Sequence, residues 1–323
     1  MHEKSALDLL RDNYPLLVIF LLGLGLRIHR LGAESIWFDE AVSVAASKLG
    51  FIEQIRWNLT ASDNNPPLYY ALLHVWVLIF GVSELALRLP SAIIGSFNIL
   101  LVYAVGNMLF NKKTGLLAAL ILALSVFHIQ FSQEGRAYSL SAFLTLLSYY
   151  FFLKSVAERK RVNSIGYIVS SVLLMYSHYY GLFVILSQNI YCAWQYTTHR
   201  KSGALDIKKW IALQAILGIL YLPGLYFLYC HTIGIQKGFW LTAPTLKVIL
   251  DCFDLYTGST ILLVILTLLS LYSVMGIGGV GLKLFPGRLS GQSQNRTEPR
   301  GLSYSNAVVL LLVWLFTPIA VPF

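Results

Sequence analysis

Charged residues are scarce in this sequence. Asp, Glu, Lys and Arg make up only 12% of its 323 residues, whereas 57% are hydrophobic. So little polar surface cannot cover a soluble globule, and the composition excludes that class. The three cysteines, Cys192, Cys230 and Cys252, fit neither a zinc spacing nor a disulfide framework. The sequence also lacks Walker and Rossmann glycine patterns, which leaves a soluble nucleotide-sugar donor without support.

Long apolar runs make up much of the sequence. They cover 14–31, 68–81, 89–110, 115–131, 137–153, 162–177, 179–197, 210–230, 260–282 and 305–321. Such runs, separated by short polar stretches, predict an all-α polytopic membrane protein. The first run resembles a secretory signal, but no small-residue cleavage site follows it. We therefore expect a retained first helix.

Basic residues gather in short polar stretches and predict the topology. The clusters are the N-terminal tail, Lys112-Lys113, Arg159-Lys160-Arg161, 199–209 and 283–300. Short loops rich in Lys and Arg stay in the cytoplasm, so the chain must cross the membrane an even number of times between clusters. Their place in these loops also accounts for the formal charge of +9 without a nucleic-acid partner.

Three apolar runs lie between the N-terminal tail and Lys112, whereas the topology requires an even number of crossings there. The run 68–81 has only 14 residues, below the roughly 20 that a helix needs to cross a bilayer. We therefore assign it to the outer face, as a juxtamembrane helix within an outer loop at 32–88. The sequence then predicts about nine transmembrane helices, with the N-terminus inside.

With this topology, the polar residues of interest all fall on the outer side, in the segments 32–88, 128–138, 177–180 and 230–259. No Asp, Glu, Lys or Arg lies in the middle of a span, whereas transporters coupled to ions usually need such groups there. Arg27 and Arg30, at the outer end of the first span, are expected to reach the headgroups by snorkelling. The candidate site therefore lies at the outer membrane surface.

Asp39 and Glu40 are adjacent carboxylates just beyond the first span, at the start of a short helix. One interpretation is that Asp39 caps this helix and Glu40 favours its positive end. The other is that one acid is a base or cation ligand and the second supports it. The residues alone leave the two interpretations equal.

Glu134 and Arg136 occupy a tight outer turn between two spans. They could pair with each other, but an exposed pair contributes only about 0–1 kcal/mol. The planar guanidinium of Arg136 is well suited to bind a phosphate, which favours function. In the next outer turn Tyr179 and Tyr180 fit the interfacial aromatic belt, whereas His178 is a candidate phosphate or cation ligand.

Four further features carry weaker signals. The stretch 63–70 has two prolines at a helix start, as a simple turn and cap would. His74 reads as a packing residue, and Glu84 and Arg88 read as a local pair or as an anchor of the helix end. Lys237 stands beside aromatic residues in 236–240, which suits a sugar or lipid-phosphate contact, and 286–301 reads as a flexible linker.

Five motifs occur in the order seen in a known superfamily. They are Asp39-Glu40, Asn65-Pro66-Pro67-Leu68-Tyr69-Tyr70, Ala86-Leu87-Arg88-Leu89-Pro90-Ser91-Ala92, Ser132-Gln133-Glu134-Gly135-Arg136-Ala137-Tyr138 and His178-Tyr179-Tyr180-Gly181. Over roughly residues 14–200 the chain resembles the membrane glycosyltransferases of the protein-mannosyltransferase and aminoarabinose-transferase superfamily, which have the GT-C fold.

The resemblance implies a reaction. A sugar leaves a polyprenyl phosphate at the outer face and joins an acceptor hydroxyl of a protein, lipid or glycan, usually with inversion. Asp39 would be the base, with Glu40 beside it. The implied substrate-binding residues are Asn65, Glu134, Arg136, Tyr138 and His178, and Asp39 and Glu134 are the candidate ligands of a divalent cation. Asn65 departs from the family, in which His or Lys is common at that position.

The resemblance also implies how the whole chain is organised and where it is located. We expect residues 1–323 to form a single membrane-embedded glycosyltransferase-like domain, in the inner membrane of a bacterium, with its active face outward. The chain stops at Phe323, where relatives continue, so we expect the C-terminal region of the family to be absent. Two alternatives stay open, namely a lipid-linked-sugar flippase and an inactive membrane scaffold.

Overall fold

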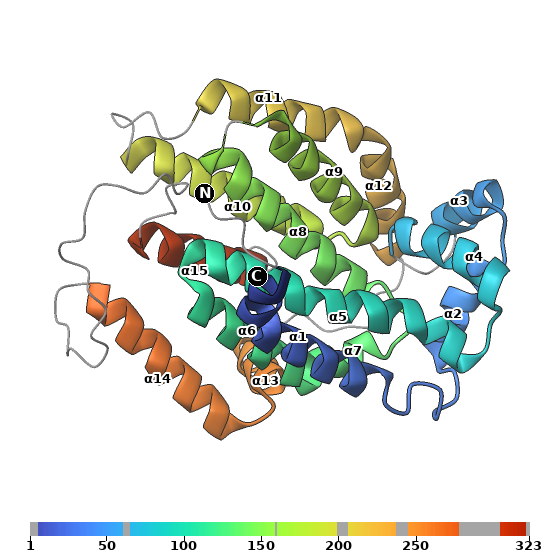
Figure 1. The fold of residues 1–323 in the computed structure, drawn as a ribbon. Helices are drawn as coiled ribbons and strands as arrows, with labels where there is room; N and C mark the ends of the chain where they lie inside the picture. Colours follow the sequence, from blue (N-terminus) through green and yellow to red (C-terminus); the bar gives the residue numbers. More distant parts are fainter. Residues whose placement is uncertain are drawn as a thin grey trace.

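The computed structural model describes residues 6–60, 65–158, 160–198, 206–236, 245–277 and 304–320. Within these ranges every regular element is an α-helix (Figure 1), which agrees with the predicted fold class. The predictions made for Asp63 and Asn64, for 237–240 and for 286–301 lie outside the described residues.

Within the described residues, each apolar run of the sequence contains at least one helix. The helices are α1 (Ala6–Ile28), α2 (Phe38–Ser47), α3 (Phe51–Thr60), α4 (Leu68–Phe80), α5 (Glu84–Leu109), α6 (Lys112–Leu124), α7 (Val126–Ser132), α8 (Tyr138–Ala157), α9 (Arg161–Ser177), α10 (Gly181–Thr198), α11 (Ile207–Leu220), α12 (Leu222–Gln236), α13 (Leu246–Thr257), α14 (Thr260–Ile277) and α15 (Tyr304–Ala320). The runs 115–131 and 210–230 are each broken into two helices, bent by 62° between α6 and α7 and by 56° between α11 and α12.

Length and composition single out a subset of these helices as membrane spans. Among the described residues, α5 and α8 qualify by themselves, and the two bent pairs raise the number to four if each pair is one span. The shorter apolar stretches Tyr14–Ile28, Leu68–Phe80 and Tyr304–Thr317 fall below the length required. The count of nine spans therefore stays a prediction.

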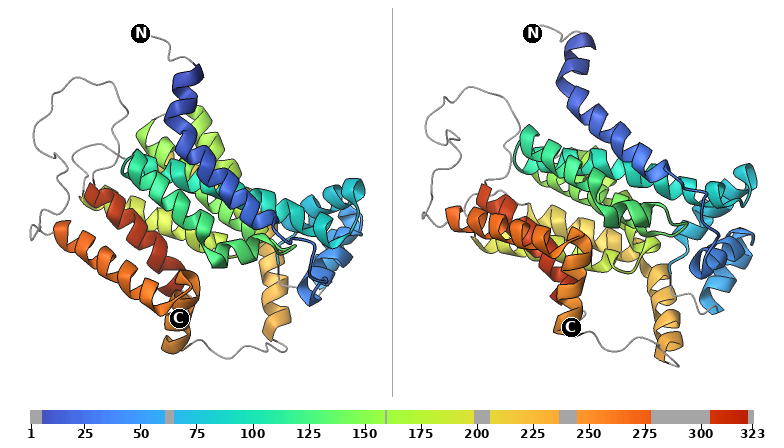
Figure 2. Two further views of the ribbon diagram at one scale, coloured as in Figure 1. Left: turned by 60° about the horizontal axis from the view of Figure 1, so that its bottom comes forward. Right: turned by 90° about the horizontal axis from the view of Figure 1, so that it is seen from below.

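The long helix α5 occupies the centre of the bundle. It packs against α1 and α6 on one side and against α8 on the other, while α9 covers α8 and α15 lies along α10 (Figures 1 and 2). α5 and α6 come very close at Gly106 and Gly115, where a Cβ on Gly115 would lie 2.7 Å from the Tyr103 carbonyl oxygen. Glycine therefore allows this helix contact.

The helices α2, α3 and α4 form a separate group at one end of α5, as Figures 1 and 2 show. Side chains of α3 and α4 cap the C-terminal end of α2: Gln54 Nε2 donates to the Ala46 carbonyl at 3.0 Å, and His74 Nδ1 donates to the Ser47 carbonyl at 2.7 Å. The bond from His74 satisfies a carbonyl of the last turn of α2, and the bond from Gln54 adds to the one that the Ala46 carbonyl accepts from the Leu49 amide at 3.2 Å. The prediction that His74 is a packing residue is confirmed.

α4 contacts α5 at a carbonyl that a proline inside α5 leaves without its helical donor. Pro90 has no N–H, so the Ala86 carbonyl four residues earlier loses its helical donor. The indole Nε1 of Trp76 donates to that carbonyl at 2.7 Å. Ser83 caps the start of α5 by accepting from the Ala86 amide at 3.3 Å. The angle between α4 and α5 is thus fixed by hydrogen bonds as well as by packing.

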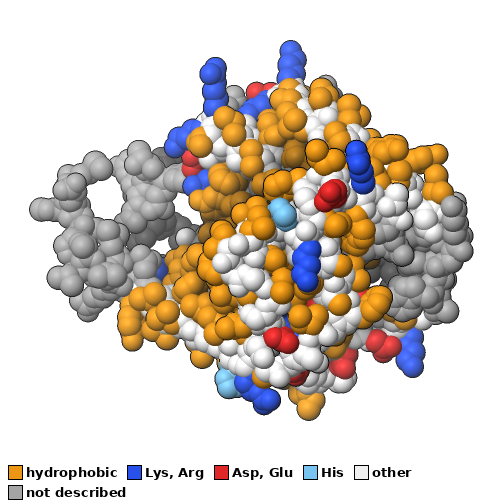
Figure 3. Space-filling view, turned by 90° about the vertical axis from the view of Figure 1, so that its right-hand side faces the viewer, with side chains coloured by type: hydrophobic (Ala, Val, Ile, Leu, Met, Phe, Trp, Pro, Cys, Tyr) orange, Lys and Arg blue, Asp and Glu red, His pale blue; other side chains and the backbone are white. Residues whose placement is uncertain are grey.

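The end of the molecule formed by α2, α3 and α4 has a mixed surface. Acidic, basic and histidine side chains stand singly among hydrophobic ones (Figure 3). Phe38, Ile52, Leu78 and Ile79 are among its exposed large hydrophobic residues. Such a surface suits the interface between a bilayer and water.

Candidate active site

Glu40 forms a buried ion pair with Arg88. Its carboxylate is fully buried and accepts from Arg88 Nε at 2.8 Å and Arg88 Nη2 at 2.7 Å. The Gly135 amide donates to it at 2.8 Å and the Trp37 amide at 3.4 Å. Burial by itself would raise the pKa of Glu40, but the hydrogen bonds from Arg88 and the two amides hold it below its ordinary value. Both carboxylate oxygens of Glu40 thus accept hydrogen bonds from the protein.

Arg88 also holds the chain between α1 and α2. Its Nη1 donates to the carbonyls of Leu31 at 3.1 Å and Glu34 at 2.8 Å, and its Nη2 donates to that of Ser35 at 3.0 Å. Of the two predicted roles, a pair with Glu84 or an anchor of the helix end, the structure shows Arg88 as an anchor of the start of α5. The planar fork of Arg88 finds a bidentate carboxylate and three carbonyls on the α1–α2 connection.

Asp39 faces a second arginine. Its Oδ2 lies 4.0 Å from Arg136 Nη2, and its side chain is 36% exposed. Arg136 Nη1 donates to the Asp39 carbonyl at 3.1 Å, to Ser43 Oγ at 3.4 Å and to the Tyr70 hydroxyl at 3.4 Å. Asp39 lies in the first turn of α2, whose N-cap is Trp37, so it is not the cap. The structure brings Asp39 and Arg136 together with the carboxylate accessible.

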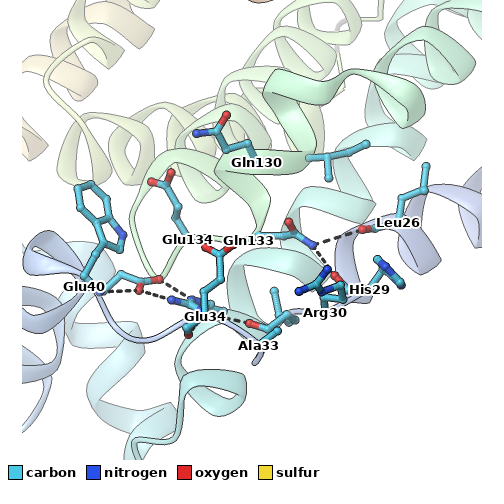
Figure 4. A pocket seen from close by; sticks show the side chains of 13 residues that line it. Leu26, His29, Arg30, Ala33, Glu34, Glu40, Gln130, Gln133 and Glu134 are labelled. Atoms are coloured by element: carbon cyan, nitrogen blue, oxygen red, sulfur yellow. Dashed lines mark hydrogen bonds and ion pairs between the residues drawn. The ribbon is translucent and has the colours of Figure 1, made fainter.

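Glu134 lies two residues before Arg136, in the turn between α7 and α8. It lines a cavity of about 650 Å³, between the end of α1, the α1–α2 connection and α7, together with Glu40, Glu34, Trp37 and Gln130 (Figure 4). Its Oε2 is buried without a hydrogen-bond partner among the described residues. Burial, and then the charge of Glu40, raise the pKa of Glu134 to about 7. Glu134 therefore changes charge near neutral pH.

His178 and Tyr138 lie beside each other, with ring centroids 6.5 Å apart. His178 Nδ1 accepts from the Tyr180 amide at 3.2 Å. Burial, and then the nearby charge of Arg136, lower the pKa of His178, which favours the neutral ring. With Nδ1 an acceptor, the ring proton is on Nε2, which makes His178 a neutral donor close to Arg136.

Asn65 is placed by the neighbouring helix. Its carbonyl accepts from Asn58 Nδ2 of α3 at 2.8 Å. Among the described residues, no group of three or more His, Cys, Asp and Glu side chains is arranged to hold a metal. A cation site formed by the two carboxylates of Asp39 and Glu134 thus stays a prediction.

The partners of two arginines could not be predicted from the sequence. Arg88 belongs to the motif 86–92, but its pairing with Glu40, 48 residues away, leaves no periodic signal. Arg27 was expected to snorkel, which is wrong, because its side chain is fully buried. Only the position of Arg27 in an otherwise apolar run pointed to a special environment.

The all-helical fold is consistent with a membrane glycosyltransferase of the GT-C type. Residues 64–227, just over half of the chain, match the model of the dolichyl-phosphate-mannose-protein mannosyltransferase family. The chain belongs to this family.

The similar proteins are longer than this chain. An uncharacterized protein of Aquifex aeolicus (strain VF5) is 29% identical over 147 residues, which are 45% of this chain and 29% of the relative. The oligosaccharyltransferase of Archaeoglobus fulgidus, solved with zinc and sulfate, aligns with a TM-score of 0.49 at 15% identity, over 94% of this chain and 39% of its own. A second structure of that organism's oligosaccharyltransferase AglB, in complex with an inhibitory peptide and a dolichol-phosphate, aligns at 14% identity over 98% and 37%, also with a TM-score of 0.49.

Proposed function

We propose that the protein transfers a sugar from a polyprenyl-phosphate donor to an acceptor hydroxyl at the outer face of a bacterial inner membrane. The observation that carries this proposal is the pair Asp39 and Arg136, whose charged groups lie 4.0 Å apart, with the side chain of Asp39 36% exposed and that of Arg136 buried. An acceptor and a donor bound there together would contact both a carboxylate base and a phosphate-binding guanidinium. The family membership supports the same chemistry.

Asp39 is the base of the proposed reaction. The acceptor hydroxyl gives its proton to the carboxylate while its oxygen attacks the anomeric carbon from the side opposite the phosphate. The bond from carbon to phosphate oxygen breaks, the phosphate keeps the electron pair, and the configuration inverts. Because the carboxylate of Glu40 is already saturated, we assign to Glu40 the task of holding α2 in place. Positioning of this kind supplies much of the catalytic effect when the leaving group is good.

Arg136 and His178 are the proposed phosphate ligands. Arg136 neutralises the charge that develops on the departing phosphate. His178, neutral with its proton on Nε2, donates a hydrogen bond to it without adding charge. Tyr138 and Asn65 are the remaining proposed substrate contacts, Tyr138 through its position beside His178.

The cavity lined by Glu134 extends the site. Its volume of about 650 Å³ lies within the range of roughly 300–1,000 Å³ typical of small-ligand pockets. The unpartnered oxygen of Glu134 can accept from a sugar hydroxyl, or share a divalent cation with Asp39 once Glu134 is ionised. Both roles need an oxygen that the protein leaves unpaired.

Transfer from a radiolabelled polyprenyl-phosphate sugar in membranes tests the proposal. Asp39→Asn is expected to lose about 100-fold or more of turnover, as the removal of a general base does. Asp251→Asn, at an exposed position of α13, is the matched control and should keep wild-type turnover. Wild-type rates in Asp39→Asn would reject the base. A wild-type protein that transfers nothing would favour the flippase or the scaffold.

A further inference from the structure

Arg27 is a fully buried cation without an acidic partner among the described residues. Its Nη1 donates to the Gly23 carbonyl of its own helix at 2.9 Å. It also donates across to α6, from Nη1 to the Ala123 carbonyl at 3.2 Å and from Nη2 to the Leu122 carbonyl at 3.0 Å. Leu122 and Ala123 belong to the last turn of α6, whose carbonyls carry a partial negative charge, and the Leu122 carbonyl also accepts from the Ser125 amide at 3.4 Å. Arg27 therefore caps the helix at its break.

The cap also reaches the helix beyond the break. Arg27 Nη2 lies 2.9 Å from His128 Nδ1, in the first turn of α7. Ser125, between the two helices, accepts from the His128 amide at 3.3 Å and so starts α7. One guanidinium from α1 thus contacts both sides of the 62° bend. This fixes the direction in which α7 leaves α6.

A second cap runs in the opposite direction. Gln133, directly after α7, uses its Nε2 to donate to three carbonyls at the end of α1: Leu26 at 3.4 Å, Arg27 at 3.2 Å and His29 at 2.9 Å. Figure 4 shows Gln133 beside Leu26 and His29. α1 ends at Ile28, so these too are carbonyls that the helix leaves unpaired. Arg27 and Gln133 form a reciprocal clamp between α1 and the broken pair α6–α7.

The residues that follow Gln133 make the contacts of the candidate active site. The Gly135 amide donates to Glu40 at 2.8 Å, and Arg136 lies 4.0 Å from Asp39. We propose that Arg27 and Gln133 are positioning residues for the transfer reaction, because their clamp sets where Gly135 and Arg136 lie relative to Asp39 and Glu40. This inference rests on the proposed function for its kinetic test only.

Gln133 allows a test in which charge and shape are separated. Gln133→Glu keeps the shape but removes the donor and places a carboxylate against helix carbonyls. Gln133→Lys supplies a cationic donor, which the negative end of a helix favours. Displacing reacting groups by about 1 Å can cost on the order of 100-fold. We expect Gln133→Glu to lose 10- to 100-fold in kcat with donor KM within about 3-fold, since the clamp acts on geometry and not on donor binding. Gln133→Lys should stay within about 3-fold of wild type in both constants.

The same substitution at two arginines supplies the second test. Arg27→Met removes the cap on α6 and should lower kcat as Gln133→Glu does. Arg56→Met, at an exposed position of α3, is the control and should behave as wild type. If Arg27→Met does not fold, the Gln133 pair still decides the matter. Wild-type kcat in Gln133→Glu, or equal losses in Gln133→Glu and Gln133→Lys, would overturn the clamp.

Hydrogen exchange keeps this inference separable from the proposed function. In the full-length protein, the amides of Gly135 and Arg136 should exchange faster in Gln133→Glu than in Gln133→Lys. Equal exchange in the two variants would overturn the clamp even if transfer is observed. If the wild type transfers no sugar but the exchange rates differ as expected, the proposed function fails and the clamp stands as a device that orders the turn.

Discussion

Glu40 and Arg88 show how a largely apolar protein keeps two ionised side chains in its interior. The pair has bidentate geometry, and the remaining donors and acceptors are used by the Gly135 amide and by carbonyls between Leu31 and Ser35. Complete hydrogen bonding offsets the cost of burying charge. The pair thereby ties the α1–α2 connection to the start of α5.

Removing one member of this pair should therefore be costly. Glu40→Leu leaves Arg88 buried and unpaired, with an expected loss of about 3–5 kcal/mol in unfolding free energy. Glu40→Leu with Arg88→Met should recover part of the loss, but not all, because the carbonyls of Leu31, Glu34 and Ser35 then lack their donor. Unfolding of the purified protein in detergent measures both. Equal stability of wild type and Glu40→Leu would contradict the structural role of the pair.

Glu134 predicts a pH dependence of stability. Its pKa in the folded protein is raised to about 7 from the ordinary 4.5, so between these values the folded state binds more protons than the unfolded state. Stability from this group is therefore present below about pH 4.5 and is lost as the pH rises through 7. We expect melting temperatures of the wild type to fall more between pH 5 and pH 8 than those of Glu134→Gln. Parallel profiles of the two proteins would refute the raised pKa.

At the scale of elements, the sequence predicts helices well and their breaks poorly. A continuous apolar run gives the same signal whether or not it bends, so nothing in 115–131 marks the break at Ser125. Arg27, which caps α6 at the break, acts through a contact in space, whereas Ser125 starts α7 by a local hydrogen bond. α3 was missed for a related reason, because it is a short helix in a polar outer segment and its hydrogen bonds to α2 are formed only in the tertiary structure.

The junction of α4 and α5 allows an element-scale prediction. Trp76→Phe removes the donor to the Ala86 carbonyl and should cost about 0.5–1.5 kcal/mol. Pro90→Ala restores a backbone N–H that can donate to the same carbonyl. In the Pro90→Ala background, Trp76→Phe should therefore cost less than in the wild type. A double-mutant cycle of unfolding free energies measures this, and strictly additive effects would show that the carbonyl does not couple the two residues.

At the scale of the whole molecule, four segments far apart in the sequence meet at one end of the bundle. Arg136 contacts Asp39, and Tyr138 lies against His178. Next to His178, the Tyr179 hydroxyl hydrogen-bonds His231 Nδ1 at 2.7 Å, and His231 Nε2 donates to the Asn58 carbonyl at 2.7 Å. The positive-inside rule had assigned these segments to one side of the membrane, and their contacts agree. The individual partners could not be predicted, because the rule assigns a side and not a position.

The side itself can be tested by labelling. If the topology is right, a cysteine at the exposed position of Arg56 in α3 lies outside, and one at the exposed position of Lys113 in α6 lies in the cytoplasm. With the native cysteines replaced by serine, a membrane-impermeant maleimide added to spheroplasts should label Arg56→Cys but label Lys113→Cys only after the membrane is opened. Because Asp39 and Arg136 are in contact, the label on α3 locates the whole proposed reaction centre. Labelling of Lys113→Cys but not Arg56→Cys in closed spheroplasts would place that centre in the cytoplasm and remove the basis for an outward-facing transferase.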